Sequence, residues 1–257
     1  MKPIKVLVHG IMGNLFENLK ERLEEIGYEV ISVIFPYQDP SKADYQDPRL
    51  ANIGIEDKVN HLLEILRQLQ AQGKKYDLIG HSAGALVSLL AASKSDIQPR
   101  KILLLSPVGM RGVWMIQFSV LRTFWKIALT WKFFRKKIKL SYEEISYSML
   151  NRISDEVRRK QIYKKMCEES GKFIFQIGFW PLDKSRASQP NIENIDCPVR
   201  LLVGDQDRIT PPAVAKANFR RFKSSKREAF HSLELIKGGG HWLFEEFPHK
   251  ILEEICS

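Results

Sequence analysis

The chain has 257 residues, of which 44% are hydrophobic and 27% are charged, with a net charge of +10. These fractions are typical of a water-soluble globule, and they exclude a disordered tail, a collagen and a coiled-coil rod. Three cysteines without a C-x-x-C pair favour a reducing compartment over a disulfide framework.

Six short apolar segments are typical of buried strands. They are Ile4–Val8, Tyr28–Phe35, Asp77–Ile79, Lys101–Leu105, Arg200–Val203 and Ser232–Ile236. They are nearly continuously apolar, as parallel strands covered on both faces are. Amphipathic helices are expected over Asn14–Ile26 and Ile55–Leu69. This alternation predicts an α/β domain with a mostly parallel six-stranded sheet flanked by helices.

The alternation of strands and helices stops after Pro107. From there to about Asn194 the chain predicts helical stretches that are dense in aromatic and basic residues. We therefore expect a helical cap, or lid, over residues 110–192. It is inserted into a core domain made of residues 1–109 and 193–257.

The positive charge of the chain is concentrated in this insert. Between Arg111 and Lys172 there are 15 basic and 6 acidic residues, a net charge of +9. The segment is either a solvated helical surface or a module with its own partner. We expect no nucleic acid as that partner, because no recognised reading motif accompanies the charge.

Membrane-spanning segments are not expected. No stretch approaches the ~18 apolar residues that a spanning helix needs, and the apolar run near the N-terminus is too short for a signal-peptide core. We expect a cytoplasmic protein, with peripheral attachment to a membrane through the insert as a further hypothesis.

The loop after the second predicted strand holds the tetrapeptide Tyr-Gln-Asp-Pro twice, at Tyr37–Pro40 and Tyr45–Pro48. Prolines and aspartates punctuate a long connection, but the duplication suggests no function.

The residues Gly80-His81-Ser82-Ala83-Gly84 form a G-x-S-x-G motif between a predicted strand and a predicted helix. A serine on such a sharp turn projects its hydroxyl away from the sheet, and the small residues on either side let the chain reverse. The helix N-terminus directs amide donors at the same place. Ser82 is therefore the candidate nucleophile.

A serine needs a base and an acid that orients the base. Asp205 and Asp207 both follow the predicted strand that ends at Val203, and His241 follows a run of three glycines after the last strand. The order serine, acid, histidine fits a strand–turn–helix nucleophile. From position alone, either aspartate can serve. No spacing typical of metal ligands is present.

With His9-Gly10 after the first strand, these residues resemble the α/β-hydrolase family over nearly the whole chain apart from the insert. The family's Gly-x-x-Asp-x-x-x-Pro turn matches Gly204, Asp207 and Pro211, which implies Asp207 as the acid. The resemblance also implies the backbone N–H groups of Ile11 and Ala83 as the oxyanion hole. The Arg-Gly-x-Gly segment of many relatives has no counterpart in Pro36–Pro48, and we do not expect the family's two antiparallel edge strands.

Four residues are candidates for the substrate pocket: Met12, His81 and Trp242, which lie beside these motifs, and Trp180 at the end of the insert. Phe173, Phe175 and Phe179, at the end of the insert, either wall an acyl pocket or pack in the core.

The first part of the insert holds Trp114, Phe118, Phe124, Trp125, Trp131, Phe133 and Phe134 among basic residues that include Lys132, Arg135, Lys136 and Lys137. These aromatic residues either form the core of the insert or lie on an anionic lipid surface. The same charge could attract an anionic acyl carrier.

These features predict a serine hydrolase that cleaves carboxylic esters or thioesters of a hydrophobic, lipid-like small molecule and needs no cofactor or metal. The alternatives are C–C bond hydrolysis, perhydrolysis or acyl transfer on the same residues, and a ligand-binding module without catalysis. The sequence does not predict an oligomeric state.

Overall fold

The structure is a computed structural model that describes residues 2–13, 15–94, 96–114, 118–129, 136–223 and 231–257. Part of the aromatic and basic segment singled out in the insert lies outside these ranges, namely Trp131, Lys132, Phe133, Phe134 and Arg135. No helix of the described ranges is both long and apolar enough to cross a membrane.

A parallel sheet forms the centre of the molecule, in the order β2-β1-β3-β4-β7-β8. Its strands are β1 (Ile4–Val8), β2 (Val30–Val33), β3 (Tyr76–His81), β4 (Ile102–Leu105), β7 (Val199–Gly204) and β8 (His231–Ile236). Every neighbouring pair is parallel, which confirms the predicted six-stranded α/β fold.

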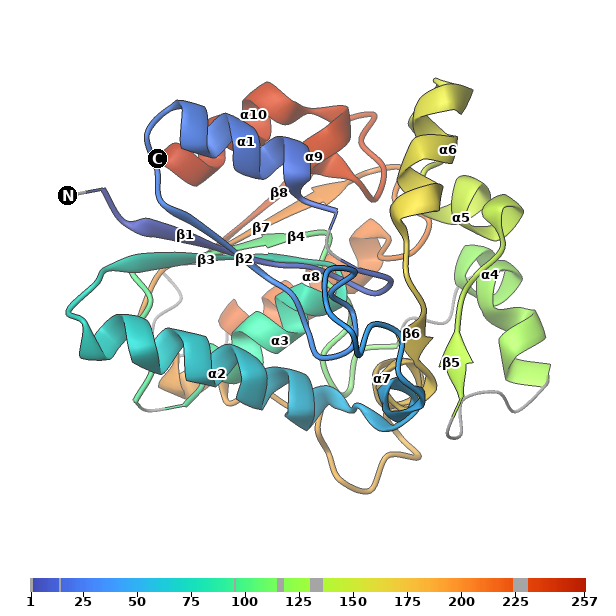
Figure 1. Cartoon of the computed structure of the whole chain (residues 1–257), viewed down its shortest axis with the longest axis horizontal. Helices are drawn as coiled ribbons and strands as arrows, with labels where there is room; N and C mark the ends of the chain where they lie inside the picture. Colours follow the sequence, from blue (N-terminus) through green and yellow to red (C-terminus); the bar gives the residue numbers. More distant parts are fainter. Residues whose placement is uncertain (1, 14, 95, 115–117, 130–135, 224–230) are drawn as a thin grey trace.

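Helices cover both faces of the sheet (Figure 1). One face is covered by α2 (Ile55–Ala71), α3 (Ala83–Ala92) and α8 (Pro212–Lys223), and the other by α1 (Glu17–Glu25), α9 (Leu243–Glu246) and α10 (Pro248–Cys256). The apolar stripe predicted for α2 is buried, from Val59 to Leu69. The two apolar cores therefore lie on opposite faces of the sheet.

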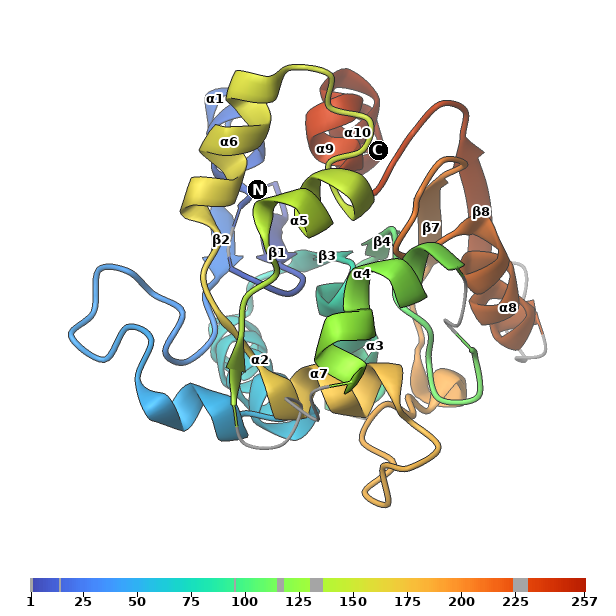
Figure 2. The same ribbon diagram turned by 90° about the vertical axis from the view of Figure 1, so that its right-hand side faces the viewer.

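The segment between β4 and β7 lies across the carboxyl ends of the strands (Figures 1 and 2). It contains α4 (Phe118–Leu129), α5 (Tyr142–Ser148), α6 (Glu156–Lys165), α7 (Gly171–Gly178), β5 (Lys137–Ile138) and β6 (Glu169–Ser170). Strands β5 and β6 form a short antiparallel pair that the sequence did not suggest. Two short 3₁₀ helices, Pro48–Asn52 and Ile192–Asn194, complete the described elements.

A buried ion pair crosses from β1 to β3 in the middle of the sheet. Lys5 and Asp77 are neighbours in the strand register, and the Lys5 Nζ lies 2.7 Å from Asp77 Oδ2. Lys5 also donates to the Ile255 carbonyl at the end of α10, at 2.7 Å. The partly exposed Arg100, just before β4, donates to the same carboxylate. The pair therefore joins two strands and one helix.

We expect Asp77→Asn to lower the free energy of unfolding by about 3–5 kcal/mol, because it leaves the Lys5 ammonium buried without its counter-charge. The matched control is Asp96→Asn, whose carboxylate pairs with Arg67 at the exposed surface and should contribute little. Urea unfolding measures both. An equal loss in the two variants would contradict the assignment.

Candidate active site

Ser82 lies on the turn between β3 and α3. Its backbone has φ 54° and ψ −121°, a conformation that costs a non-glycine residue about 1–3 kcal/mol. Its amide donates to the Leu105 carbonyl at 2.9 Å and so extends the strand ladder by one residue. The strained turn places the serine in the wall of a pocket at the carboxyl edge of the sheet.

Two glycines allow other backbone segments to approach this turn. A Cβ on Gly10 would lie 2.8 Å from the Ser82 Cβ, and one on Gly84 would lie 2.2 Å from the Val8 carbonyl oxygen. Neither position can hold a larger residue without a shift of the main chain. The loop after β1 and the start of α3 therefore meet at Ser82.

His241 and Asp207 come together from the ends of β8 and β7. The His241 Nδ1–H donates to Asp207 Oδ2 at 2.8 Å, and both side chains are buried. Thr210 Oγ1–H donates to the same oxygen, while the amides of Ile209 and Thr210 donate to Oδ1. These four bonds fix the position of the carboxylate. Because the His241 proton is on Nδ1, the lone pair of its Nε2 is available.

The second candidate acid, Asp205, has a different partner. Its Oδ1 accepts from the Gly238 amide at 2.7 Å, in the glycine run before His241. The structure thus brings Asp207, and not Asp205, to the imidazole.

The protonation of Asp207 follows from these contacts. Burial by itself raises the pKa of Asp207, but the charge of His241 and the hydrogen bonds from His241 and Thr210 outweigh it and lower the pKa to about 2. The carboxylate is therefore charged at neutral pH and stabilises an imidazolium at His241.

Ser82 and His241 line the same pocket, but neither Ser82 Oγ nor His241 Nε2 has a hydrogen-bond partner within the described residues. Within the described residues, the structure therefore contains the histidine–aspartate hydrogen bond but no hydrogen bond between Ser82 and His241.

The predicted oxyanion donors lie on either side of the serine. Ile11 lines the pocket, and Ala83 is the first residue of α3, where a helical amide has no partner within its own helix. Neither amide donates to an acceptor in the described part of the chain. Both are therefore available to a ligand.

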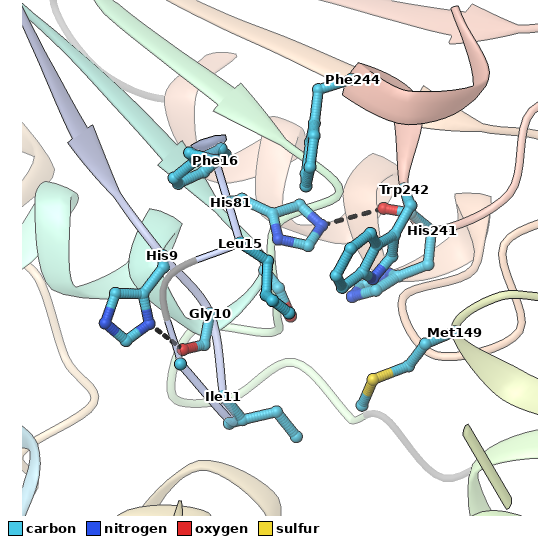
Figure 3. A pocket seen from close by; sticks show the side chains of 12 residues that line it. His9, Gly10, Ile11, Leu15, Phe16, His81, Met149, His241, Trp242 and Phe244 are labelled. Carbon is cyan, nitrogen blue, oxygen red and sulfur yellow. Dashed lines mark hydrogen bonds between the residues drawn. The ribbon is translucent and has the colours of Figure 1, made fainter. Parts of the chain in front are cut away.

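The pocket is mostly apolar, and its walls come from both the body and the insert (Figure 3). It is lined by His9, Gly10, Ile11, Gly13, Leu15, Phe16, His81, Ser82, Met149, His241, Trp242 and Phe244. The cavity volume is about 10 Å³, room for roughly one water molecule. A ligand much larger than water therefore needs part of this wall to move.

Two of the four candidate pocket residues, His81 and Trp242, line this cavity. The other two, Met12 and Trp180, are not among its lining residues. Met12 is fully buried beside the insert, and the Trp180 ring packs against Trp114 with 5.0 Å between centroids. Of the three phenylalanines at the end of the insert, Phe173 is buried in a core and Phe175 stacks on Phe179.

Met149, Leu15, Phe16 and Phe244 line the pocket but were not predicted from the sequence. Only Phe244 had a usable signal, because it lies three residues after His241 in the chain. Met149 follows α5 of the insert, and its place depends on how the insert packs. No cluster of metal-ligating side chains occurs in the described ranges.

Two further histidines support the pocket as neutral groups. His81 Nε2–H donates to the His241 carbonyl at 2.9 Å, and His9 Nδ1–H donates to the Gly10 carbonyl at 2.7 Å (Figure 3). Burial lowers the pKa of each to about 3, helped at His81 by the charge of His241 and at His9 by that of Lys58.

We expect acid to destabilise the fold partly through His81. Its pKa is lower in the folded than in the unfolded state, so the unfolded chain binds one more proton between about pH 3 and 6.5, and stability is lost as pH falls through that window. His81→Gln should reduce the pH dependence of the unfolding free energy there by about 1.4 kcal/mol per pH unit. Urea unfolding from pH 4 to 8 measures this slope; above pH 7 the slopes of variant and wild type should agree. An unchanged acid slope would contradict the neutral assignment.

Comparisons with known proteins agree with this architecture. The structure resembles a monoacylglycerol lipase from Paleococcus ferrophilus, with 22% identity, a TM-score of 0.62 and coverage of 98% of this chain and 93% of that one. It also resembles a polyneuridine aldehyde esterase, with 15% identity, a TM-score of 0.69 and coverage of 99% and 98%. A meta-cleavage product hydrolase from Pseudomonas fluorescens IP01 gives 13% identity, a TM-score of 0.67 and coverage of 99% and 89%.

At these identities the solved structures establish the fold alone. No curated protein sequence matches the chain significantly. A family model described as "Alpha/beta hydrolase family" matches residues 6–254. With the strand order and the serine turn already described, that match shows that the chain belongs to the alpha/beta hydrolase family.

Proposed function

We propose that the protein is a serine hydrolase that cleaves carboxylic esters or thioesters of a hydrophobic substrate. The observation that carries this proposal is the hydrogen bond from His241 to the buried Asp207 carboxylate, in the same pocket as the strained Ser82. A purely structural role for these residues would not explain why an oriented imidazole lines the same pocket as a serine in a strained conformation.

In the proposed reaction Ser82 Oγ attacks the substrate carbonyl and His241 Nε2 takes its proton. The negative charge that develops on the carbonyl oxygen is stabilised by the amides of Ile11 and Ala83. The imidazolium then protonates the leaving alcohol or thiol. Water, activated by the same imidazole, attacks the acyl-enzyme and releases the acid. The chain supplies the nucleophile, the base and the oxyanion donors of this proposed reaction, and the solvent supplies the water.

The apolar wall supports a hydrophobic acyl group. Leu15, Phe16, Met149 and Trp242 offer few polar contacts to a substrate, so burial of apolar surface would dominate recognition. Trp242 also lines a neighbouring cavity of about 20 Å³ on the same side as α6. Movement of Trp242 would join the two spaces.

Other chemistry on the same residues remains the alternative. The structural neighbours include a lipase, an esterase and a meta-cleavage product hydrolase, and neither the fold nor a serine–histidine–aspartate set separates ester from C–C bond hydrolysis. A chain-length series of p-nitrophenyl esters and acyl thioesters, beside a vinylogous diketone, distinguishes them.

We expect a fluorophosphonate probe to label the wild type and not Ser82→Ala. Asp207→Asn should lower kcat by about 10⁴-fold, because the asparagine NH2 group can donate to Nδ1 and so favours the imidazole tautomer whose Nε2 cannot act as the base. The control is Asp205→Asn, which changes a carboxylate two residues away that binds the Gly238 amide, and it should retain most of the activity. Labelling of Ser82→Ala, or equal losses in the two aspartate variants, would contradict these roles.

We propose, in addition, that the outer surface of the insert binds an anionic membrane. On α4, Phe118, Leu121 and Trp125 are 77%, 53% and 47% exposed, and their spacing puts them on one side of the helix. This helix lies at the outer side of the molecule, beyond the strand ends (Figures 1 and 2).

The positive charge of the sequence around α4 favours binding to a negatively charged lipid surface. From Arg111 to Ser141 the sequence has eight basic residues and no acidic one. Large aromatic side chains favour the headgroup boundary of a bilayer, and nearby Lys and Arg add attraction to anionic lipids. An anionic acyl carrier would use the charge but not the exposed apolar side chains, so we favour the membrane.

Wild-type protein should sediment with phosphatidylcholine vesicles that contain phosphatidylglycerol, less so at high salt, and little with phosphatidylcholine alone. The double variant Phe118→Ser/Trp125→Ser should reduce binding about tenfold or more, because it removes apolar contacts. Val157→Ser is the control, since Val157 is an equally exposed apolar residue on α6. Equal binding by the two variants would refute the surface, and binding only to an acyl carrier would identify the other partner.

A further inference from the structure

A buried ion pair joins the insert to the body beside the candidate active site. Lys58 on α2 and Glu169 on β6 both have fully buried side chains, and the Lys58 Nζ lies 2.9 Å from each carboxylate oxygen. The ammonium also lies over the rings of Phe35 and Phe173, 4.6 and 4.1 Å from their centroids. Because burying two charges costs about as much as their attraction returns, such a pair needs a reason other than stability.

The carboxylate has a second function in the loop that follows β1. Glu169 Oε2 accepts from the backbone N–H of Met12 at 3.3 Å, and the amide of Cys167 donates to the Met12 carbonyl at 3.0 Å. The chain around β6 therefore holds Met12 on both sides. Met12 has φ 69°, a left-handed conformation that persists only where its surroundings enforce it.

Met12 directly follows Ile11, the proposed oxyanion donor. Holding the Met12 amide fixes the plane of the Ile11–Met12 peptide, and this limits the rotation of Ile11 about its own backbone bonds. The direction of the Ile11 N–H is thus linked to a carboxylate of the insert. Catalytic amides are effective only when they are aimed before the reaction begins.

The duplicated Tyr-Gln-Asp-Pro motif keeps Glu169 in place. Gln38, in the first copy, donates to the Glu168 carbonyl at 3.1 Å and to Glu169 Oε2 at 3.3 Å. Gln46, in the second copy, accepts from the Glu168 amide at 3.2 Å. The two glutamines therefore bind the carbonyl and the amide of Glu168. The side chain of the next residue, Glu169, contacts Lys58 and Met12.

We propose that Glu169 is a positioning residue that holds the Met12 amide, and through it the Ile11 N–H, in the geometry of the oxyanion hole. Lys58 compensates the charge of Glu169 in the core, and the two motif glutamines set its direction. The inference rests on the proposed serine hydrolase function, but the contacts themselves do not depend on it. Acyl transfer to Ser82 would then require that β6 be seated against the loop.

Two double variants isolate the contact. Lys58→Met/Glu169→Gln removes both charges and keeps a side-chain oxygen that can accept from Met12. Lys58→Met/Glu169→Met removes both charges and the acceptor. Neither leaves an unpaired buried charge, so both should fold. They differ in the acceptor at position 169, which serves the Met12 amide, the Ser170 amide and the Gln38 side chain.

We expect Lys58→Met/Glu169→Gln to keep kcat close to that of the wild type. Lys58→Met/Glu169→Met should lose about 10²–10³-fold in kcat, the effect of one misplaced oxyanion donor, with KM little changed. Its affinity for a boronic acid that forms a tetrahedral adduct on Ser82 should fall in parallel. Equal kcat in the two variants, or a loss matched by a lower melting temperature, would overturn the proposal.

Hydrogen exchange followed by mass spectrometry separates this inference from the proposed function, because it needs no turnover. A peptide covering residues 9–16 should exchange faster in Lys58→Met/Glu169→Met than in Lys58→Met/Glu169→Gln. If the wild type neither reacts with fluorophosphonate nor cleaves esters, the hydrolase proposal fails while faster exchange still supports the Glu169 contact. Equal exchange in the two variants would overturn the contact itself.

Discussion

The common carboxyl edge of the parallel strands is the constraint on which the candidate site depends. The loop after β1, the serine turn after β3, the acid turn after β7 and the histidine loop after β8 all begin at this edge. In an antiparallel sheet, neighbouring strands would end on opposite sides, and these groups would be separated by the length of a strand. Right-handed crossovers bring the four loops together although they are far apart in the chain. The chemistry proposed for Ser82 and His241 follows from this topology more than from any local motif.

The parallel sheet also supplies the stability that a strained turn requires. Ser82 adopts an unfavourable backbone conformation. Gly84 admits the main chain of Val8 and His9, and Gly10 admits the Ser82 Cβ, at distances that a larger residue does not permit. These local costs are of the order of a few kcal/mol. They are offset because β3 is an inner strand, with all six residues buried between β1 and β4. The candidate nucleophile therefore follows a strand that is fully buried and paired on both sides.

The sequence was sufficient for the sheet and for the residues after its strands, because buried parallel strands leave continuous apolar runs and sharp turns leave glycines. It was insufficient wherever the insert meets the body. Lys58 lies on the apolar face of α2, three residues after Ile55 and four before Leu62, but the helical pattern does not reveal the partner of a lysine there. Glu169 belongs to a two-residue strand that is too short to have a period. Met149 and Trp180 illustrate the same limit, since their places depend on how helices of the insert pack. The Tyr-Gln-Asp-Pro duplication was visible, but its role required the partner strand.

The insert is attached to the body by two kinds of contact that respond differently to solvent. At the rim, Arg158 pairs with Glu245 and Lys165 with Glu17, so part of the basic charge of the insert is compensated by acids of the body. These pairs are partly or largely exposed, and salt screens them. The Lys58–Glu169 pair is buried and is screened much less. Arg158 and Lys165 belong to α6, whereas Glu169 of the buried pair belongs to β6. Loss of the exposed pairs would therefore leave the contact between β6 and the loop that carries Ile11 in place. Separate attachment of α6 and of the Ile11 loop thus suits the proposed function, in which the wall of a pocket with room for about one water has to move for the substrate while the proposed oxyanion donor stays in place.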